Sequence, residues 1–425
     1  MLGGGYFTAQ NKVIPGTYIN FVGANRSTTL SDNGTVAMAL ELGWGPDLTI
    51  QAIDPDAAFK NAKNLFGVEY TDDSLKPIRE VFAHAKKLLL CRLNGSGVKG
   101  TCTYGTAKYA GTVGNNLKVV IATDVDDSDK YDVSLYLGSS LVDLQIVETA
   151  AELVDNDYIV WDKEASLAVT AGTSLTGGTN STVTGTQHTS FLSALENEAY
   201  NVLCTTSTDA TVQSLYVAFT KRMIEEVGVK IQTVLYNKAA DHEGIINEAT
   251  SADLVPWLAG ASASCPLGKT LTNFKYDGEY EITAQYTQAD LKSAIENGKI
   301  VFHKVGNDYR LLRDINSLVT LTGDKTADFK QNQTVRVINQ IGNDVATIFN
   351  TQFLGLTPND KAGRIALWSA LVDYFNKLVQ LRAIEEFNPS DITVEMGETK
   401  NAVVVNTAIV PINCMEILYM TVLIG

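Results

Sequence analysis

The sequence is poor in residues that bind metals or build reactive centres. It has five cysteines and four histidines among 425 residues, and both kinds are widely scattered. It contains no Cys-x-x-Cys pair and no histidine cluster, whereas a zinc site needs its ligands close together. We therefore expect reduced, mostly buried thiols, no metal site and no cofactor.

Long apolar runs and an excess of positive charge are also missing. No stretch reaches the ~18 apolar residues of a transmembrane helix, and the N-terminus has no basic region followed by an apolar segment. The net charge is −15, from 33 Lys and Arg against 48 Asp and Glu. Such a protein is repelled by nucleic-acid phosphates and anionic lipids. These absences predict no membrane insertion, no secretion, no direct nucleic-acid partner and assembly in a cytoplasm.

What remains is the composition of a globular, multidomain protein. Hydrophobic residues make up 45% of the chain and charged residues 19%, which is outside the disordered range. A chain of 425 residues exceeds one ordinary core, so we expect roughly two to four domains. Residues 1–22 begin with a glycine run and then alternate around Pro15 and Gly16, which predicts an extended N-terminal arm.

Strand and helix patterns alternate in two separated parts of the chain, residues 23–95 and 187–305. The second part contains a βαβ pattern, which implies a parallel sheet; its elements are a strand at Val202–Thr205, a helix at Thr211–Glu226 and a strand at Lys230–Tyr236. The first part predicts strands and helices at Val36–Leu42, Asp56–Leu65, Ser74–His84 and Lys87–Leu93. The simplest arrangement is a single α/β middle domain built from both parts.

Residues 96–186 have a different pattern, in which helical periodicity fades and Gly, Thr, Val and Asp become frequent. Short strands separated by turn clusters indicate an inserted all-β domain, a small barrel or sandwich. The strands are expected at Asn116–Thr123, Tyr131–Leu137, Ser140–Val147 and Tyr158–Trp161. The segment Thr170–Gly185 is almost all Thr, Gly, Ser and Asn, which predicts an exposed loop.

Residues 306–425 predict an α+β C-terminal domain. Its long helices are expected at Asp328–Phe349 and Asp360–Ala383, followed by strands near Ile392–Glu395 and Ala402–Ile409. The chain then ends in the nearly all-apolar segment Met415–Ile424. Because so apolar a terminus is seldom left loose in water, it is either a central strand of its own domain or a strand donated elsewhere.

One segment could belong to an enzyme. Gly260–Pro266 has a Gly-x-Ser followed by small residues and a proline, as in the serine segment of subtilisin-like proteases, with Ser262 or Ser264 as nucleophile. A catalytic triad also needs a histidine and an aspartate, but Glu243 separates His242 from the following glycine. A helix end closed by proline explains the segment better.

The acidic residues Asp124, Asp126 and Asp129 could form a weak calcium site. They lack the glycine and the distal glutamate of a calcium-binding loop.

Five segments, in order along nearly the whole chain, together resemble the tail sheath proteins of contractile phages and phage-tail-like bacteriocins, especially those of Gram-positive hosts. Each segment is weak evidence alone, but their order is specific. They are Pro15–Asn20, Tyr109–Leu117, Tyr236–Asn247 with Trp257–Gly260, Arg336–Asn339 with Leu381–Ile384, and Pro411–Val422.

The resemblance implies a structural protein and not an enzyme. It implies an α+β multidomain fold in which the α/β middle domain is subtilisin-like in shape only. It also implies hexameric rings stacked around a tail tube, contraction of that lattice, location in a virion tail, and baseplate and tail terminator proteins as partners. The competing classes are a serine hydrolase, a secreted adhesin or layer protein, and a tail tube protein.

The candidate functional residues are those of two strand-exchange arms and one charged surface. Apolar strands at both chain ends could complete a neighbour's sheet by β-augmentation. The arm residues are Val13, Ile14, Tyr18, Ile19 and Phe21 near the N-terminus, and Val403, Val405, Ile409, Met415, Ile417, Leu418, Tyr419, Val422 and Leu423 in a donated strand of about 402–425. Lys361 and Arg364 begin the second long helix and are candidates to face acidic groups on the tube.

Overall fold

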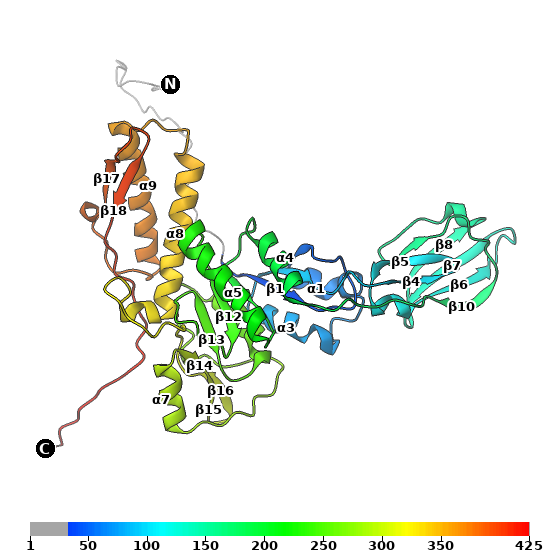
Figure 1. Cartoon of the computed structure of the whole chain (residues 1–425), viewed down its shortest axis with the longest axis horizontal. Helices are drawn as coiled ribbons and strands as arrows, with labels where there is room; N and C mark the ends of the chain where they lie inside the picture. Colours follow the sequence, from blue (N-terminus) through cyan, green and yellow to red (C-terminus); the bar gives the residue numbers. More distant parts are fainter. Residues whose placement is uncertain (1–32, 425) are drawn as a thin grey trace, which may run out of the picture. The chain divides into compact units, whose positions relative to one another are not determined.

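A computed structural model describes residues 33–424. These residues form two compact units. We call residues 33–343, 378–387 and 409–424 the body unit, and residues 344–377 and 388–408 the helical unit. The fold is mixed α+β with several sheets, which confirms the predicted class (Figure 1).

The body unit is built on a seven-stranded sheet that joins distant parts of the sequence. Its strand order is β14-β13-β12-β11-β1-β3-β2. All neighbours are parallel except β2 and β3. The strands, in sheet order, are Lys299–Ile300, Ile245–Glu248, Gln232–Tyr236, Val202–Cys204, Thr35–Leu40, Lys87–Arg92 and Ile50–Ile53.

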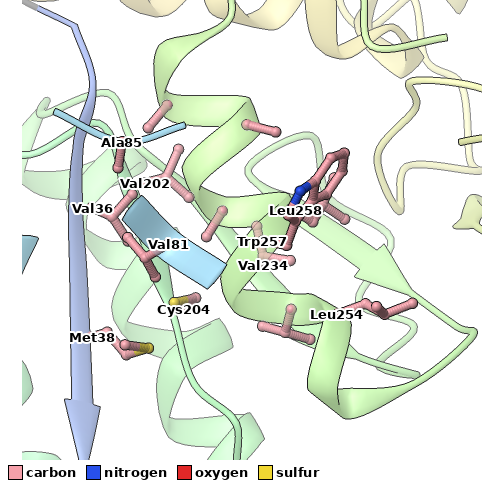
Figure 2. Close-up of a cluster of buried hydrophobic side chains, with 14 of the residues drawn as sticks. Val36, Met38, Val81, Ala85, Val202, Cys204, Val234, Leu254, Trp257 and Leu258 are labelled. Atoms are coloured by element: carbon pink, nitrogen blue, oxygen red, sulfur yellow. The ribbon is translucent and has the colours of Figure 1, made fainter. Parts of the chain in front are cut away.

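Helices cover both faces of this sheet, because its central strands are apolar on both sides. Val36 and Met38 of β1 pack in one core with α3 (Lys76–Phe82) and α6 (Val255–Ser264). Figure 2 shows part of this core, in which Trp257 and Leu258 of α6 lie with the strand residues. Ala37 and Ala39 face the opposite core, which contains residues of α4 (Gly185–Leu195) and α5 (Ala210–Arg222).

The predicted helix Asp56–Leu65 is two short helices, α1 (Pro55–Lys60) and α2 (Ala62–Phe66). Asp54 starts α1 as expected, since its carboxylate accepts a hydrogen bond from the Ala57 N–H at 2.7 Å. An N-terminal cap followed by proline fixes the start of a helix. The break falls at Asn61, whose backbone leaves the helical region.

The β insertion is a sandwich of two sheets around one core. The four-stranded sheet has the order β10-β6-β7-β8 and the three-stranded sheet the order β4-β5-β9. The strands of the four-stranded sheet are, in that order, Thr170–Ser174, Leu117–Thr123, Tyr131–Leu137 and Ser140–Val147. Those of the three-stranded sheet are Lys99–Cys102, Gly105–Ala110 and Ile159–Trp161.

The predicted loop Thr170–Gly185 is wrong in its first part, which forms β10. Leu175 explains the difference, because its side chain is fully buried in the sandwich core and its N–H donates to the Leu117 carbonyl at 2.9 Å. One apolar residue anchors a segment whose composition otherwise indicates a loop.

Buried Arg92 fastens the sandwich to the α/β sheet. It ends β3 and is 3% exposed. Its Nη1 donates to the carbonyls of Gly45 and Ala110, both at 2.8 Å, and its Nη2 donates to Asn180 Oδ1 at 3.2 Å. Its Nε donates to Asn94 Oδ1 at 3.1 Å. Asn94 and Asn180 lie where the chain crosses between the two domains, Gly45 follows β1 of the α/β sheet, and Ala110 ends β5 of the sandwich. One guanidinium therefore joins the two domains.

The rest of the body unit continues from the sheet into α8 (Asn332–Gln352), which crosses into the helical unit. Before it come α7 (Gln288–Glu296) and the hairpin β15–β16 (Phe302–Val305 and Asp308–Leu311). Asp314 and Arg336 form a buried ion pair of 2.7 Å that attaches the first half of α8 to the body. The pKa of Asp314 is lowered, because the adjacent guanidinium outweighs the effect of burial.

The helical unit contains the second half of α8, most of α9 (Lys361–Gln380) and the antiparallel pair β17 (Thr393–Met396) and β18 (Val403–Asn406). Trp368 Nε1 of α9 donates to the Ile392 carbonyl at 3.2 Å. On α9, Phe375 is buried, whereas Ile365 is 55% exposed.

Candidate assembly surfaces

The C-terminal segment exposes apolar side chains. Leu418, Tyr419, Leu423 and Ile424 are 84%, 90%, 93% and 95% exposed. Within the described residues, no strand is assigned after Asn406, and the end of the chain runs out as an extended segment (Figure 1). These side chains belong to no core within residues 33–424, which does not fit a central strand in its own domain.

The root of this segment is held by polar contacts. Glu416 forms a 2.9 Å ion pair with Arg313 Nε and accepts a hydrogen bond from Thr272 Oγ1 at 2.6 Å. Gln333 accepts from the Cys414 N–H at 3.0 Å and donates to the Ile412 carbonyl at 3.0 Å. The chain is thus attached up to Glu416. We call residues 417–424 the C-terminal arm.

The sheet β17–β18 is a two-stranded pair, and no third strand joins it within residues 33–424. Val403 lies opposite Met396, and Val405 lies opposite Val394. This corrects the prediction of one donated strand over about 402–425, because Val403 and Val405 pair within their own chain. An isolated two-stranded ribbon is marginally stable in water and has two edges that can pair further.

The two cations predicted to face the tube lie beside a groove in the helical unit. Lys361 and Arg364 line it together with apolar Trp368 and Met396. The groove has a volume of about 490 Å³. Arg364 is held in place, since its Nη1 donates to Asn359 Oδ1 at 3.0 Å and to the Asn359 carbonyl at 3.1 Å. Of the other arm candidates, Ile409 is half-buried, and Val13, Ile14, Tyr18, Ile19 and Phe21 fall outside the described residues.

No nucleophile and base meet at the enzyme-like segment. Ser262 lies within α6 and is 2% exposed, and in the part of the chain that the structure describes neither Ser262 Oγ nor Ser264 Oγ has a hydrogen-bond partner. His242 Nδ1 instead accepts the Gly244 N–H at 3.0 Å, and its Nε2 lies 3.2 Å from Glu225 Oε1. Burial lowers the pKa of His242. A serine that lacks a base and solvent access cannot act as a hydrolytic nucleophile.

The acidic loop is a turn. Asp124 Oδ1 accepts the N–H groups of Asp126 and Asp127 at 2.9 and 2.7 Å. In residues 33–424, no group of three His, Cys, Asp or Glu side chains is placed to hold a metal ion. Over the same residues, no helix is long and apolar enough to cross a membrane.

Four family models match consecutive parts of the chain. They are the tail sheath protein Gp18 domain III N-terminal region (residues 33–93), the phage tail sheath protein β-sandwich domain (94–180), the phage tail sheath protein central domain (181–317) and the phage tail sheath C-terminal domain (324–425).

A solved structure of a sheath tail protein from Desulfitobacterium hafniense is 32% identical, with a TM-score of 0.84 over 94% of this chain and 98% of that one. The chain belongs to the phage tail sheath protein family. The phage-like element PBSX protein XkdK of Bacillus subtilis is 29% identical over 99% of both chains. The helical sheath of the anti-feeding prophage, solved in its contracted state, shares the fold at 12% identity, with a TM-score of 0.55 over 96% and 99% of the two chains.

This tail sheath protein is therefore a structural, non-enzymatic component of a phage or phage-like contractile tail. The sequence resemblance to the family is confirmed, and the serine hydrolase alternative is wrong. The clamp at Glu416 was missed by the sequence analysis. Its signal was available, because Glu416 is the one charged residue within the apolar segment Met415–Ile424.

Proposed function

We propose that this tail sheath protein assembles into stacked hexameric rings around a tail tube and contracts by rearranging that lattice, which drives the tube through a host envelope. The observation that carries the proposal is the apolar C-terminal arm, residues 417–424, exposed beyond a clamped root. An exposed apolar segment of this kind marks an interaction site.

The receiving surface in this proposal is the sheet β17–β18 of a neighbouring subunit. Extended peptides add to open sheet edges by main-chain hydrogen bonds, and alternate side chains supply specificity. The C-terminal arm would occupy one edge, and the N-terminal arm with Val13, Ile14, Tyr18, Ile19 and Phe21 would occupy the other. A donor patch that differs from its acceptor makes a heterologous contact, which generates rings or helical arrays.

The free energy of binding one C-terminal arm should be small, whereas many arms acting together in a lattice should bind strongly. The C-terminal arm exposes seven large hydrophobic side chains. Burying all of them would give roughly 10–20 kcal/mol. Ordering its backbone would cost roughly 8–16 kcal/mol. The two quantities are similar, so a single arm binds only modestly. Two arms per subunit, repeated along a sheath, hold the lattice while each contact stays exchangeable.

The helical unit would face the tube, with Lys361 and Arg364 directed to acidic groups on it. Support comes from the two cations, which line one groove together with a single acid, Glu395. Baseplate and tail terminator proteins are the further partners, and assembly takes place in a host cytoplasm. The fold shared with a contracted helical sheath supports the helical assembly.

Contraction in this proposal needs no nucleotide. The extended lattice is metastable and held by a kinetic barrier. Release lets the subunits repack into a lattice that buries more surface, at ~25 cal/mol for each Å² of apolar area. The middle domain, residues 23–95 and 187–305, keeps a subtilisin-like fold in this proposal, with residues 96–186 as its insertion and 306–425 as the C-terminal domain. The three-layer arrangement around a parallel sheet supports it.

Deleting residues 417–425 tests the proposal while leaving the clamp at Glu416 intact. The full chain should form tubes in negative-stain electron microscopy, and the truncated chain should stay soluble and monomeric by analytical ultracentrifugation. The double variant Leu418→Asp, Leu423→Asp should behave like the deletion. Val125→Asp is the matched control, because Val125 is 95% exposed but lies in the β insertion. Tubes formed by the truncated chain would show that arm donation is wrong.

A further inference from the structure

A small polar cavity lies in the body unit between the sheet, α6 and the first half of α8. Its volume is about 40 Å³. It is lined by Ser262 of α6, by Arg336 and Asn339 of α8, and by Lys230 before β12. At this volume it has room for roughly three water-sized groups.

Two buried side chains at this cavity have donors without a partner. Arg336 is 8% exposed, and its Nη2 is used by Asp314 Oδ2 at 2.7 Å and by the Lys269 carbonyl at 3.3 Å. Its Nε and Nη1 are buried and have no hydrogen-bond partner among residues 33–424. The same holds for Ser262 Oγ. A buried donor left unpaired costs about 1–3 kcal/mol, and more when it is charged. These donors come from α6 and α8, so a single group in the cavity can bind both helices.

The charge at the cavity favours a negative group. Lys230 and Arg336 both line it, and none of the described residues in its lining is acidic. The Nζ of Lys230 donates to the Ile224 carbonyl at 2.9 Å, so Arg336 is the cation with donors left for a ligand. Asp314 offsets one of the two cations through Arg336 Nη2 and does not bond to Nε or Nη1. The unpaired groups on Arg336 can only donate, because a guanidinium has no acceptor. A negatively charged acceptor matches this donor set better than a neutral water molecule. A water molecule would also need acceptors for its own two hydrogens.

We propose that this cavity binds a small monovalent anion of halide size, with Arg336 Nε and Nη1 and Ser262 Oγ as its hydrogen-bond donors. The size of the cavity selects against sulfate or phosphate, which have more heavy atoms than it can hold. The ion would brace the first half of α8 against α6. This site is independent of arm donation, since it involves no residue of either arm.

Thermal unfolding of the full-length chain against bromide concentration tests the site, with sodium gluconate holding the ionic strength constant. A ligand that binds only the folded state raises Tm with a saturating concentration dependence. We expect Tm to rise to a plateau as the bromide or chloride concentration increases, and we expect no such rise with sulfate. An equal effect of all salts would mean that the cavity holds only water and would overturn the proposal.

Two variants test whether the bromide effect on Tm arises at this cavity. Arg336 itself is kept, because its loss would leave Asp314 buried and unpaired. Ser262→Ala deletes one donor, and Asn339→Asp adds a carboxylate to the lining at the same side-chain size. Each should raise the apparent Kd for bromide by roughly tenfold, since a hydrogen bond to a charged group contributes about 1.5–3 kcal/mol. Ser264→Ala is the control, because Ser264 Oγ is also buried and unpartnered but does not line the cavity. An unchanged Kd in both test variants would contradict the assignment.

Crystals of the full-length protein soaked in bromide give a direct readout. One anomalous peak in contact with Arg336 Nη1 and Ser262 Oγ is expected. A cavity that shows density but no anomalous signal would identify water and refute the anion site.

Discussion

Replacing Arg92 with methionine should loosen the junction between the β sandwich and the α/β sheet. Arg92 is buried, and its five hydrogen bonds reach Gly45, Asn94, Ala110 and Asn180. Burial lowers the pKa of its guanidinium to about 10, so it stays charged at neutral pH. Methionine fills similar space but donates nothing to these acceptors.

The expected loss follows from the acceptors that remain. The carbonyls of Gly45 and Ala110 lose donors at 2.8 Å, and Asn180 Oδ1 loses one at 3.2 Å. An unsatisfied buried group costs about 1–3 kcal/mol, and removing the buried charge itself offsets part of that loss. We expect a net loss of about 3 kcal/mol in the free energy of opening the junction, or roughly 100-fold faster amide exchange.

Hydrogen exchange with mass spectrometry, read on peptides covering residues 94–116 and 176–183, measures this directly. Arg92→Lys keeps the charge but cannot reach all the acceptors, so its effect should be intermediate. Lys87→Met, at the exposed start of β3, controls for loss of a cation from the same strand. Exchange in Arg92→Met within about twofold of the parent protein would refute the role given to this residue.

Three further changes test the remaining reasoning. Glu416→Gln should weaken the contact with Arg313 by only about 1 kcal/mol, because both side chains are partly exposed. Amide hydrogen exchange over residues 411–416 should then be roughly fivefold faster, and exchange in peptides of the sandwich should not change. Asp54→Ala should lower the free energy of unfolding in urea by about 1 kcal/mol through loss of the α1 cap, whereas Asp56→Ala should not. Burial raises the pKa of Glu248 to about 8 from 4.5. The stability it contributes is therefore full below pH 4.5 and lost as pH rises through 8, so Glu248→Gln should flatten the Tm profile between pH 5 and 8. The same slope in both proteins would contradict a neutral Glu248.

Local patterns predicted the regular elements well where burial is periodic. The strands Tyr131–Leu137 and Ser140–Val147 were predicted at their observed bounds, and the βαβ unit around α5 is parallel as expected. β10 was missed, because Thr, Gly and Ser make up most of its sequence. α4 was missed although Thr184 and Gln187 form a capping box at its start, since that start adjoins the segment predicted as a loop. The antiparallel edge strand β2 was also missed, since only four residues form it.

The candidate site was predictable in chemistry but not in connectivity. Apolar composition identified Leu418, Tyr419 and Leu423 as residues that need a partner, and they are exposed. Composition could not show that Val403 and Val405 pair within their own chain, because a hairpin strand and a donated strand have the same alternation. It also could not reveal the contact between Glu416 and Arg313, which are distant in sequence.

The most direct test of arm donation is a cryo-electron microscopy map of assembled tubes at a resolution that traces side chains. If the arm is donated, residues 417–424 form a strand on the β17–β18 sheet of a neighbouring subunit. Glu416 then still contacts Arg313 of its own chain. A map in which residues 417–424 fold back onto their own subunit, or in which β17–β18 gains no strand from another chain, would contradict it.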